Sequence, residues 1–203
     1  MKDLTDQELQ TLLNARFEQS MSLPLSFLSS QAEQIAAACW AMARRFHQGG
    51  RLLAFGTGAF ATDAQHVSVE FVHPVVVGKR ALPAIALTNE NTILSRSPDD
   101  CSSRGSVAQQ LKLLARKQDI ALGFVPDGAC QSVVEALGTA KRMELLTIGL
   151  AGDESKLLQR CAVDFCFAVP SRDLCAIQET HETLYHVLWE LVHVFFEHEG
   201  LLQ

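Results

Sequence analysis

Five short runs of apolar residues, most of them separated by helix-like segments, constrain the fold of this chain more than any other feature. The runs cover residues 52–55, 84–87, 120–125, 145–150 and 163–169. Strands that are apolar throughout and alternate with helices are typical of a parallel sheet buried on both faces. The helix-like segments cover residues 63–72, 107–117, 131–143 and, more briefly, 156–159. The pattern predicts a three-layer α/β fold with five parallel strands.

Both ends of the chain add helices to this pattern. The first fifty residues predict two helices, a helical hairpin. Thr5 with Glu8, and Ser30 with Glu33, fit the capping box, in which a hydroxyl and a carboxylate satisfy free amides at a helix start. Apolar residues at helical spacing in the second helix stop at Gly49-Gly50, and a long final helix is expected over about residues 175–198.

The composition limits the class of protein. No linker or repeat divides the 203 residues, so we expect a single domain, 1–203. A net charge of −6 without a Lys/Arg cluster argues against a nucleic-acid partner. No stretch approaches the ~18 apolar residues that cross a membrane, so no membrane partner is expected. The six cysteines show no CxxC spacing, which favours a reducing cytoplasm.

Ligands of a parallel α/β sheet bind beyond the carboxyl ends of its strands. The turns expected there cover residues 56–60, 88–91 and 126–130, and we predict that they build the site. Gly56, Thr57 and Gly58 begin a permissive match to the dinucleotide fingerprint. The fingerprint also requires an acidic residue at the end of the second strand, about 20 residues further on. Here the second strand ends some thirty residues after the glycines, so this requirement is not met. We therefore expect no nucleotide cofactor.

Two pairs of side chains carry the candidate chemistry. His66 and Glu70 are four residues apart, so on a helix they share one face and can bind one metal or divide acid and base roles. Gln178 and His186 are eight residues apart, about 12 Å along a straight helix. For both to reach one metal ion, either Gln178 lies in the loop before the helix or the two residues come from different protomers. His186 also fits a buried structural histidine, since it lies between apolar residues.

Several blocks of sequence resemble the sugar isomerase (SIS) domain family, and within it the bacterial phosphoheptose isomerases. Residues 56–66, Gly-Thr-Gly-Ala-Phe-Ala-Thr-Asp-Ala-Gln-His, resemble the family's Gly-Asn-Gly-Gly-Ser-x-x-Asp-Ala-x-His, and Glu70 follows at the family spacing. Residues 82–86, Leu-Pro-Ala-Ile-Ala, resemble its second strand. Residues 177–181, Ile-Gln-Glu-Thr-His, continuing to His186, resemble the opening of its last helix. The resemblance covers nearly the whole chain.

The resemblance implies a zinc site and an isomerase activity. In the family, the residues that match His66, Glu70, Gln178 and His186 surround a zinc ion. Those that match Glu70 and His186 are the proposed acid and base of aldose–ketose interconversion. The resemblance also implies a homotetramer. We expect residues 1–50 to take part in oligomerisation and the site to lie at a subunit interface.

The chain departs from the family where the substrate phosphate should bind. Phe60 stands at the position of a serine, residues 125–130 read Val-Pro-Asp-Gly-Ala-Cys instead of a serine-rich loop, and Pro74 replaces an arginine. Phosphate is normally held by hydroxyls and backbone amides, so the substrate is expected to be altered. Asn89, Asp99 and Asp127 would then contact sugar hydroxyls, although Asp99 fits a turn equally well.

A second function is compatible with the same residues. The phosphoheptose isomerase group includes a paralogue that associates with a replication initiator and uses this fold as a scaffold. Loss of the phosphate loops also fits such a protein-binding role. A sugar-responsive DNA-binding regulator is disfavoured, because the N-terminal helices are too short and too acidic for a DNA-binding segment.

Overall fold

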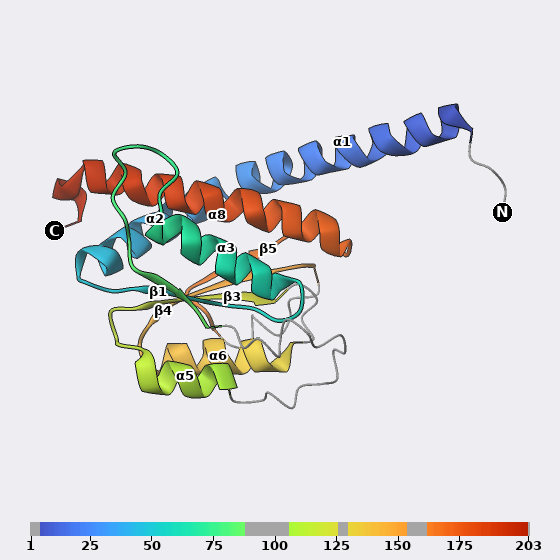
Figure 1. Ribbon diagram of the computed structural model, residues 1–203. Helices are drawn as coiled ribbons and strands as arrows, with labels where there is room; N and C mark the ends of the chain where they lie inside the picture. Colours follow the sequence, from blue (N-terminus) through green and yellow to red (C-terminus); the bar gives the residue numbers. More distant parts are fainter. Residues whose placement is uncertain (1–4, 88–105, 126–129, 154–161, 203) are drawn as a thin grey trace.

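Five parallel strands form one sheet at the centre of the fold (Figure 1). The computed structural model describes residues 5–87, 106–125, 130–153 and 162–202. The sheet has the order β2-β1-β3-β4-β5, and Leu52 pairs with Ala84 on one side and Ile120 on the other. The strands are β1 (Leu52–Phe55), β2 (Ala84–Ala86), β3 (Ile120–Val125), β4 (Leu146–Ala151) and β5 (Phe165–Ala168). The predicted five-stranded parallel sheet is confirmed.

Helices cover both faces of this sheet, so the three-layer architecture is confirmed as well (Figure 1). Helices α5 (Ser106–Leu114) and α6 (Gln131–Arg142) lie on one face. Helices α2 (Ala32–His47), α3 (Phe60–Val72) and α8 (Leu174–Glu197) lie on the other. The short helix expected over residues 156–159 lies outside the described residues.

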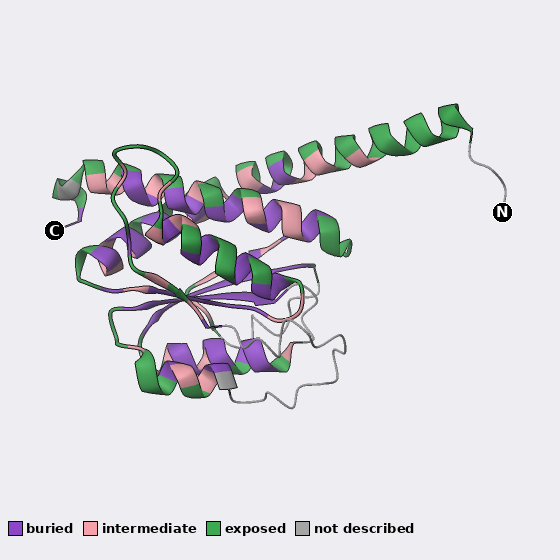
Figure 2. Ribbon diagram, in the orientation of Figure 1, coloured by how far each residue is buried: buried purple, intermediate pink, exposed green. Residues whose placement is uncertain are grey.

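Alternating side chains of the strands enter two separate cores. Leu52 and Ala54 of β1 pack with α2, α3 and α8, whereas Leu53 and Phe55 pack with α5 and α6. Figure 2 shows the central strands buried along their length. Because both faces of the sheet are covered, every position of a central strand can be apolar. This explains why the strands appear in the sequence as continuous apolar runs.

The two N-terminal helices are α1 (Asp6–Ser30) and α2, which meet at Gln31 and both pack against α8. The capping box at Thr5 and Glu8 is confirmed: the Glu8 amide donates to Thr5 Oγ1 at 3.3 Å, and the Thr5 amide donates to Glu8 Oε2 at 2.8 Å. The second predicted capping box is wrong. Helix α1 continues through Ser30, whose hydroxyl donates to the Phe27 carbonyl instead of capping α2.

Helix α8 is the long C-terminal helix expected from the sequence. Asp173 caps its start, accepting from the amides of Cys175 and Ala176 at 2.9 and 3.3 Å. A short 3₁₀ turn, η2 (Glu199–Leu201), follows it. Within the described ranges, no helix combines the length and the apolar character needed to span a lipid bilayer.

His181 joins α8 to the sheet. The side chain is fully buried, and its Nε2 lies 3.1 Å from the carbonyl oxygen of Ala151, the last residue of β4. The rings of Phe60 and Phe124 surround it, each with its centroid 6.1 Å from the imidazole. Burial lowers the pKa of His181 to about 4, and the hydrogen bond to Ala151 only partly opposes this. The folded protein therefore holds His181 neutral.

This burial predicts a loss of stability in mild acid. Between the ordinary histidine pKa of 6.5 and the folded value of about 4, the unfolded chain binds the proton and the folded chain does not. The free energy of unfolding should therefore fall as pH drops through this window, by about 2 kcal/mol from His181 between pH 7 and pH 5. Urea unfolding at pH 7 and at pH 5 measures this fall in the free energy of unfolding.

His181→Gln keeps an N–H donor but does not titrate, so the free energy of unfolding of this variant should fall by about 2 kcal/mol less than that of the wild type. His47→Gln, at an exposed histidine, should behave like the wild type, and equal losses in all three proteins would contradict the prediction.

Candidate metal and active site

The turn between β1 and α3 sets the start of the site. A Cβ at Gly56 would lie 2.4 Å from the carbonyl oxygen of Phe60, so only glycine fits there. Gly58 has φ +57, in the left-handed region that glycine adopts without strain. The amide of Phe60 donates to the Thr57 carbonyl at 3.2 Å as α3 begins. This tight turn starts α3 directly at the carboxyl end of β1.

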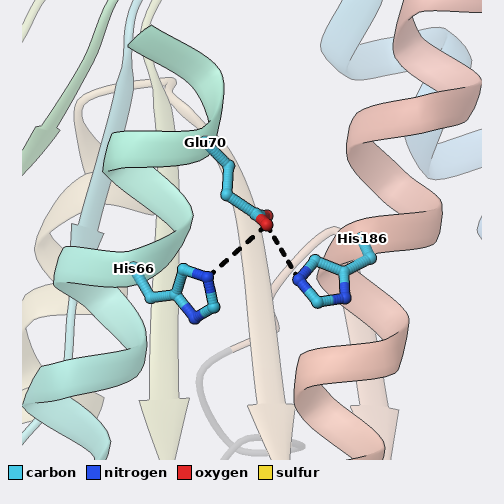
Figure 3. Close-up of side chains that lie close together, drawn as sticks. All are labelled: His66, Glu70 and His186. Carbon is cyan, nitrogen blue, oxygen red and sulfur yellow. Dashed lines mark ion pairs between the residues drawn. The ribbon is translucent and has the colours of Figure 1, made fainter. Parts of the chain in front are cut away.

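Three candidate metal ligands come together from two helices (Figure 3). His66 and Glu70 lie one turn apart on α3, and His186 projects toward them from α8. Oε1 of Glu70 lies 3.5 Å from Nε2 of His66 and 2.8 Å from Nε2 of His186. One ligand atom from each residue lies within 4.8 Å of the others. The alternative of a buried structural histidine is wrong for His186, whose side chain is 45% exposed.

Glu70 is the buried centre of this cluster. Its side chain is 15% exposed, and its second oxygen, Oε2, is buried without a hydrogen-bond partner among the described residues. Burial raises the pKa of Glu70, while the charges of His186 and His66 oppose that rise. A buried carboxylate that has one oxygen beside two imidazole nitrogens and the other without a partner offers a donor set that suits a zinc ion. The residues present therefore fit the metal that the sequence predicted.

Gln178, the fourth predicted ligand, contacts α3 through Asp63. It lies inside α8 and not in the loop before it, so the first of the two alternatives for Gln178 is wrong. Its Nε2 donates to Oδ2 of Asp63 at 2.9 Å. Asp63 is buried, and burial raises its pKa to about 6 against the opposing hydrogen bond from Gln178.

Asp63 and Tyr185 are residues of the site that the sequence analysis did not single out. Asp63 accepts the hydrogen bond from Gln178, and the Tyr185 hydroxyl lies 2.9 Å from Nδ1 of His66. The sequence held a signal for each, since Asp63 precedes His66 by about one helical turn and Tyr185 is the neighbour of His186. Together the contacts pair α3 with α8 in the same direction along both helices: Asp63 with Gln178, His66 with Tyr185, and Glu70 with His186.

The predicted substrate-binding residues divide into two groups. Gly56, Thr57 and Gly58 form the turn at the carboxyl end of β1, where Oγ1 of Thr57 lies 3.0 Å from Sγ of Cys130 at the start of α6. Phe60 is buried and packs against His181. The other predicted residues, Asn89, Asp99 and Asp127, lie outside the described residues.

The chain is similar to known proteins in both sequence and fold. The SIS domain pattern matches residues 16–152. The phosphoheptose isomerase of Thermodesulfovibrio yellowstonii is 34% identical over 192 residues, which is 94% of each chain. That of a Roseiflexus species is 35% identical over 86% of this chain and 88% of the relative. The solved phosphoheptose isomerases of Neisseria gonorrhoeae and Francisella tularensis match with TM-scores of 0.78 and 0.80, each at 26% identity and covering 91% of this chain and 98% of the other. The chain therefore belongs to the SIS domain family, and within it to the group that contains the phosphoheptose isomerases.

Proposed function

We propose that this protein is a metal-dependent isomerase that interconverts an aldose and a ketose. One observation carries the proposal: ligand atoms of His66, Glu70 and His186, from two helices, lie within 4.8 Å of one another. The similarity to phosphoheptose isomerases supports the class of reaction. The alternative, a non-catalytic scaffold, does not need this cluster.

The proposed metal is zinc, held by Nε2 of both histidines and by the Glu70 carboxylate. Two nitrogens and one oxygen are the usual protein donors of a catalytic zinc, which keeps a further position open. When bound, zinc would polarise the sugar carbonyl and stabilise negative charge on its oxygen. We keep Gln178 as a further ligand, contributed across an interface between copies, because it lies inside the same helix as His186 and eight residues before it. Its amide nitrogen is held by Asp63, which leaves the amide oxygen to bind.

Glu70 and His186 are the proposed acid–base pair. Glu70 takes the proton from the carbon beside the carbonyl, the electron pair forms the carbon–carbon double bond, and His186 gives a proton to the carbonyl oxygen. In the second half, His186 takes the proton of the neighbouring hydroxyl, and Glu70 returns its proton to the other carbon. Burial of Glu70 supports this role, because a raised pKa makes a carboxylate a stronger base. A bound zinc ion would weaken the same base, so the ligand role and the base role of Glu70 would compete.

The proposed substrate is a sugar or sugar derivative without a phosphate group. Phe60 stands where the family has a serine, and its buried ring packs against His181 and offers no hydrogen bond. In the sequence, Pro126 lacks an amide donor and Asp127 carries a negative charge where the family has hydroxyls. Thr57 and Cys130, 3.0 Å apart, offer polar atoms that suit a sugar hydroxyl.

We further propose a cytoplasmic homo-oligomer, a tetramer by family resemblance, assembled through the N-terminal helices. Apolar side chains recur every four residues along α1, where they form one stripe with exposures of 44–70%: Leu9, Leu13, Phe17, Met21 and Leu25. Figure 2 shows the N-terminal part of α1 largely exposed. A continuous exposed apolar stripe indicates an interaction surface. We propose that a second copy of this chain covers the stripe. Under the scaffold alternative, a different protein would cover it.

The metal site predicts bound zinc that depends on His66. Protein purified without an affinity tag or chelator should contain about one zinc per chain, measured by elemental mass spectrometry. His66→Ala removes one ligand and should retain less than about a tenth of that zinc, with an unchanged circular dichroism spectrum. His73→Ala, an exposed histidine at the end of the same helix, is the control and should keep the metal. A folded wild-type protein that neither contains nor takes up zinc would favour the scaffold alternative.

The loss of the phosphate loops predicts a change of substrate. With zinc present, sedoheptulose 7-phosphate should be converted no faster than by Glu70→Gln, because Phe60 and Asp127 replace the groups that hold phosphate. Free sedoheptulose should be isomerised at least about tenfold above that variant, since a positioned acid–base pair contributes on the order of a hundredfold or more. Sugar products are separated by chromatography. Conversion of the phosphorylated sugar well above the variant would refute the claim about the loops.

The apolar stripe predicts that a charge on α1 weakens assembly. Phe17→Glu places a carboxylate in the centre of the stripe and should shift the molar mass, measured by light scattering after gel filtration, toward the monomer. The sheet should stay folded, because Phe17 is 62% exposed within one chain. Gln19→Glu, at an exposed position off the stripe, is the matched control and should leave the mass unchanged. If Phe17→Glu also kept the wild-type mass, the stripe would not be the interface.

A further inference from the structure

Tyr185, the only tyrosine of the chain, lies against both candidate histidine ligands. Its side chain is fully buried on α8. The phenol ring meets the His66 ring edge to face at 5.5 Å and the His186 ring at 5.0 Å, and it packs against Phe124 at 6.2 Å. These contacts fix the ring, and its hydroxyl ends 2.9 Å from Nδ1 of His66.

This hydrogen bond occupies the nitrogen of His66 that faces away from Glu70. Nε2 of the same ring faces the Glu70 carboxylate at 3.5 Å. The imidazole is 45% exposed, so packing alone does not hold its orientation. The bond to a buried hydroxyl supplies the missing constraint, because it fixes which nitrogen points toward α8 and which toward Glu70.

The Tyr185 hydroxyl suits both states of the site, because it can donate or accept. Without a metal, the hydroxyl can donate to Nδ1, which leaves the ring proton on Nε2, facing Glu70. When Nε2 is a metal ligand, the ring proton must lie on Nδ1, which then donates to the hydroxyl oxygen. Metal-binding histidines usually donate their other N–H to a fixed acceptor, which sets the tautomer and orients the ring.

Glu182 also lies near Nδ1 of His66, and it is a weaker candidate for this role. Its Oε1 lies 3.7 Å from Nδ1, beyond hydrogen-bond distance, and its side chain is 46% exposed. Tyr185 is closer, fully buried and packed on several sides.

We propose that Tyr185 is a positioning residue of the metal centre, which holds His66 with Nε2 directed at the metal. The inference rests on the proposed function, since it assumes that His66 is a ligand. Tyr185 itself contacts neither the metal nor the substrate. Removing the Tyr185 hydroxyl leaves His66 in the site but lets its imidazole ring rotate. Metal binding must then fix the orientation of that ring. Loss of such an outer partner typically weakens metal binding by roughly 10–100-fold.

The test compares zinc affinity in Tyr185→Phe and in the wild type. Both proteins, stripped of metal and dialysed, are titrated with zinc against a chromophoric chelator. Phe keeps the ring contacts and loses only the hydroxyl, so zinc should bind about 10–100-fold more weakly while the thermal midpoint of the metal-free protein stays close to wild type. Thr183→Ala removes an exposed hydroxyl from the same helix and should leave the affinity unchanged. The visible spectrum of the cobalt-loaded protein gives a second readout and should change in Tyr185→Phe alone.

The outcomes separate this inference from the proposed function. Equal zinc affinity and equal cobalt spectra in wild type and Tyr185→Phe would overturn the role of Tyr185 and leave the metal site standing. If Glu182→Gln weakened zinc binding while Tyr185→Phe did not, Glu182 would hold His66 and the proposal would be wrong. A wild-type protein that takes up neither zinc nor cobalt would overturn the metal site and this inference together.

Discussion

The contact between α3 and α8 is the constraint on which the candidate site depends. The two helices lie on the same face of the sheet and meet along three successive pairs: Asp63 with Gln178, His66 with Tyr185, and Glu70 with His186. Each helix is anchored separately. Gly56 starts α3 at the end of β1, and buried His181 bonds α8 to the end of β4. A change in either anchor would move one half of the ligand set relative to the other.

Glu70 shows how the site balances opposing electrostatic effects. Burial alone would favour the protonated carboxyl, whereas two imidazoles beside Oε1 favour the charged form. The Oε2 atom, buried and without a partner in the described part of the chain, would be costly to keep in a purely structural role. A cation bound by the Glu70 carboxylate, as we propose, would relieve that cost.

Two features of the chain bear on the proposals of an altered ligand and an assembly of copies. Buried Phe60 replaces a hydroxyl with an apolar ring beside His181, which suits a ligand without phosphate better than a dianion. The stripe on α1, with Phe17 at its centre, stays exposed in the single chain, as do the edges of His66 and His186. A neighbouring copy is the proposed cover of this stripe.

The sequence by itself determined the parallel sheet, its helical layers and the shared helical face of His66 and Glu70. Continuous apolar runs require burial on both faces, and a spacing of four residues places His66 and Glu70 on one helical face whatever surrounds them. Only the tertiary structure decided that Gln178 bonds to Asp63 and that the Tyr185 hydroxyl lies against Nδ1 of His66. The physical reason is that these contacts depend on how two helices, more than a hundred residues apart in sequence, are placed and rotated against each other. Local spacing fixes which residues share a face, but the packing of that face against its neighbour fixes what each of them contacts.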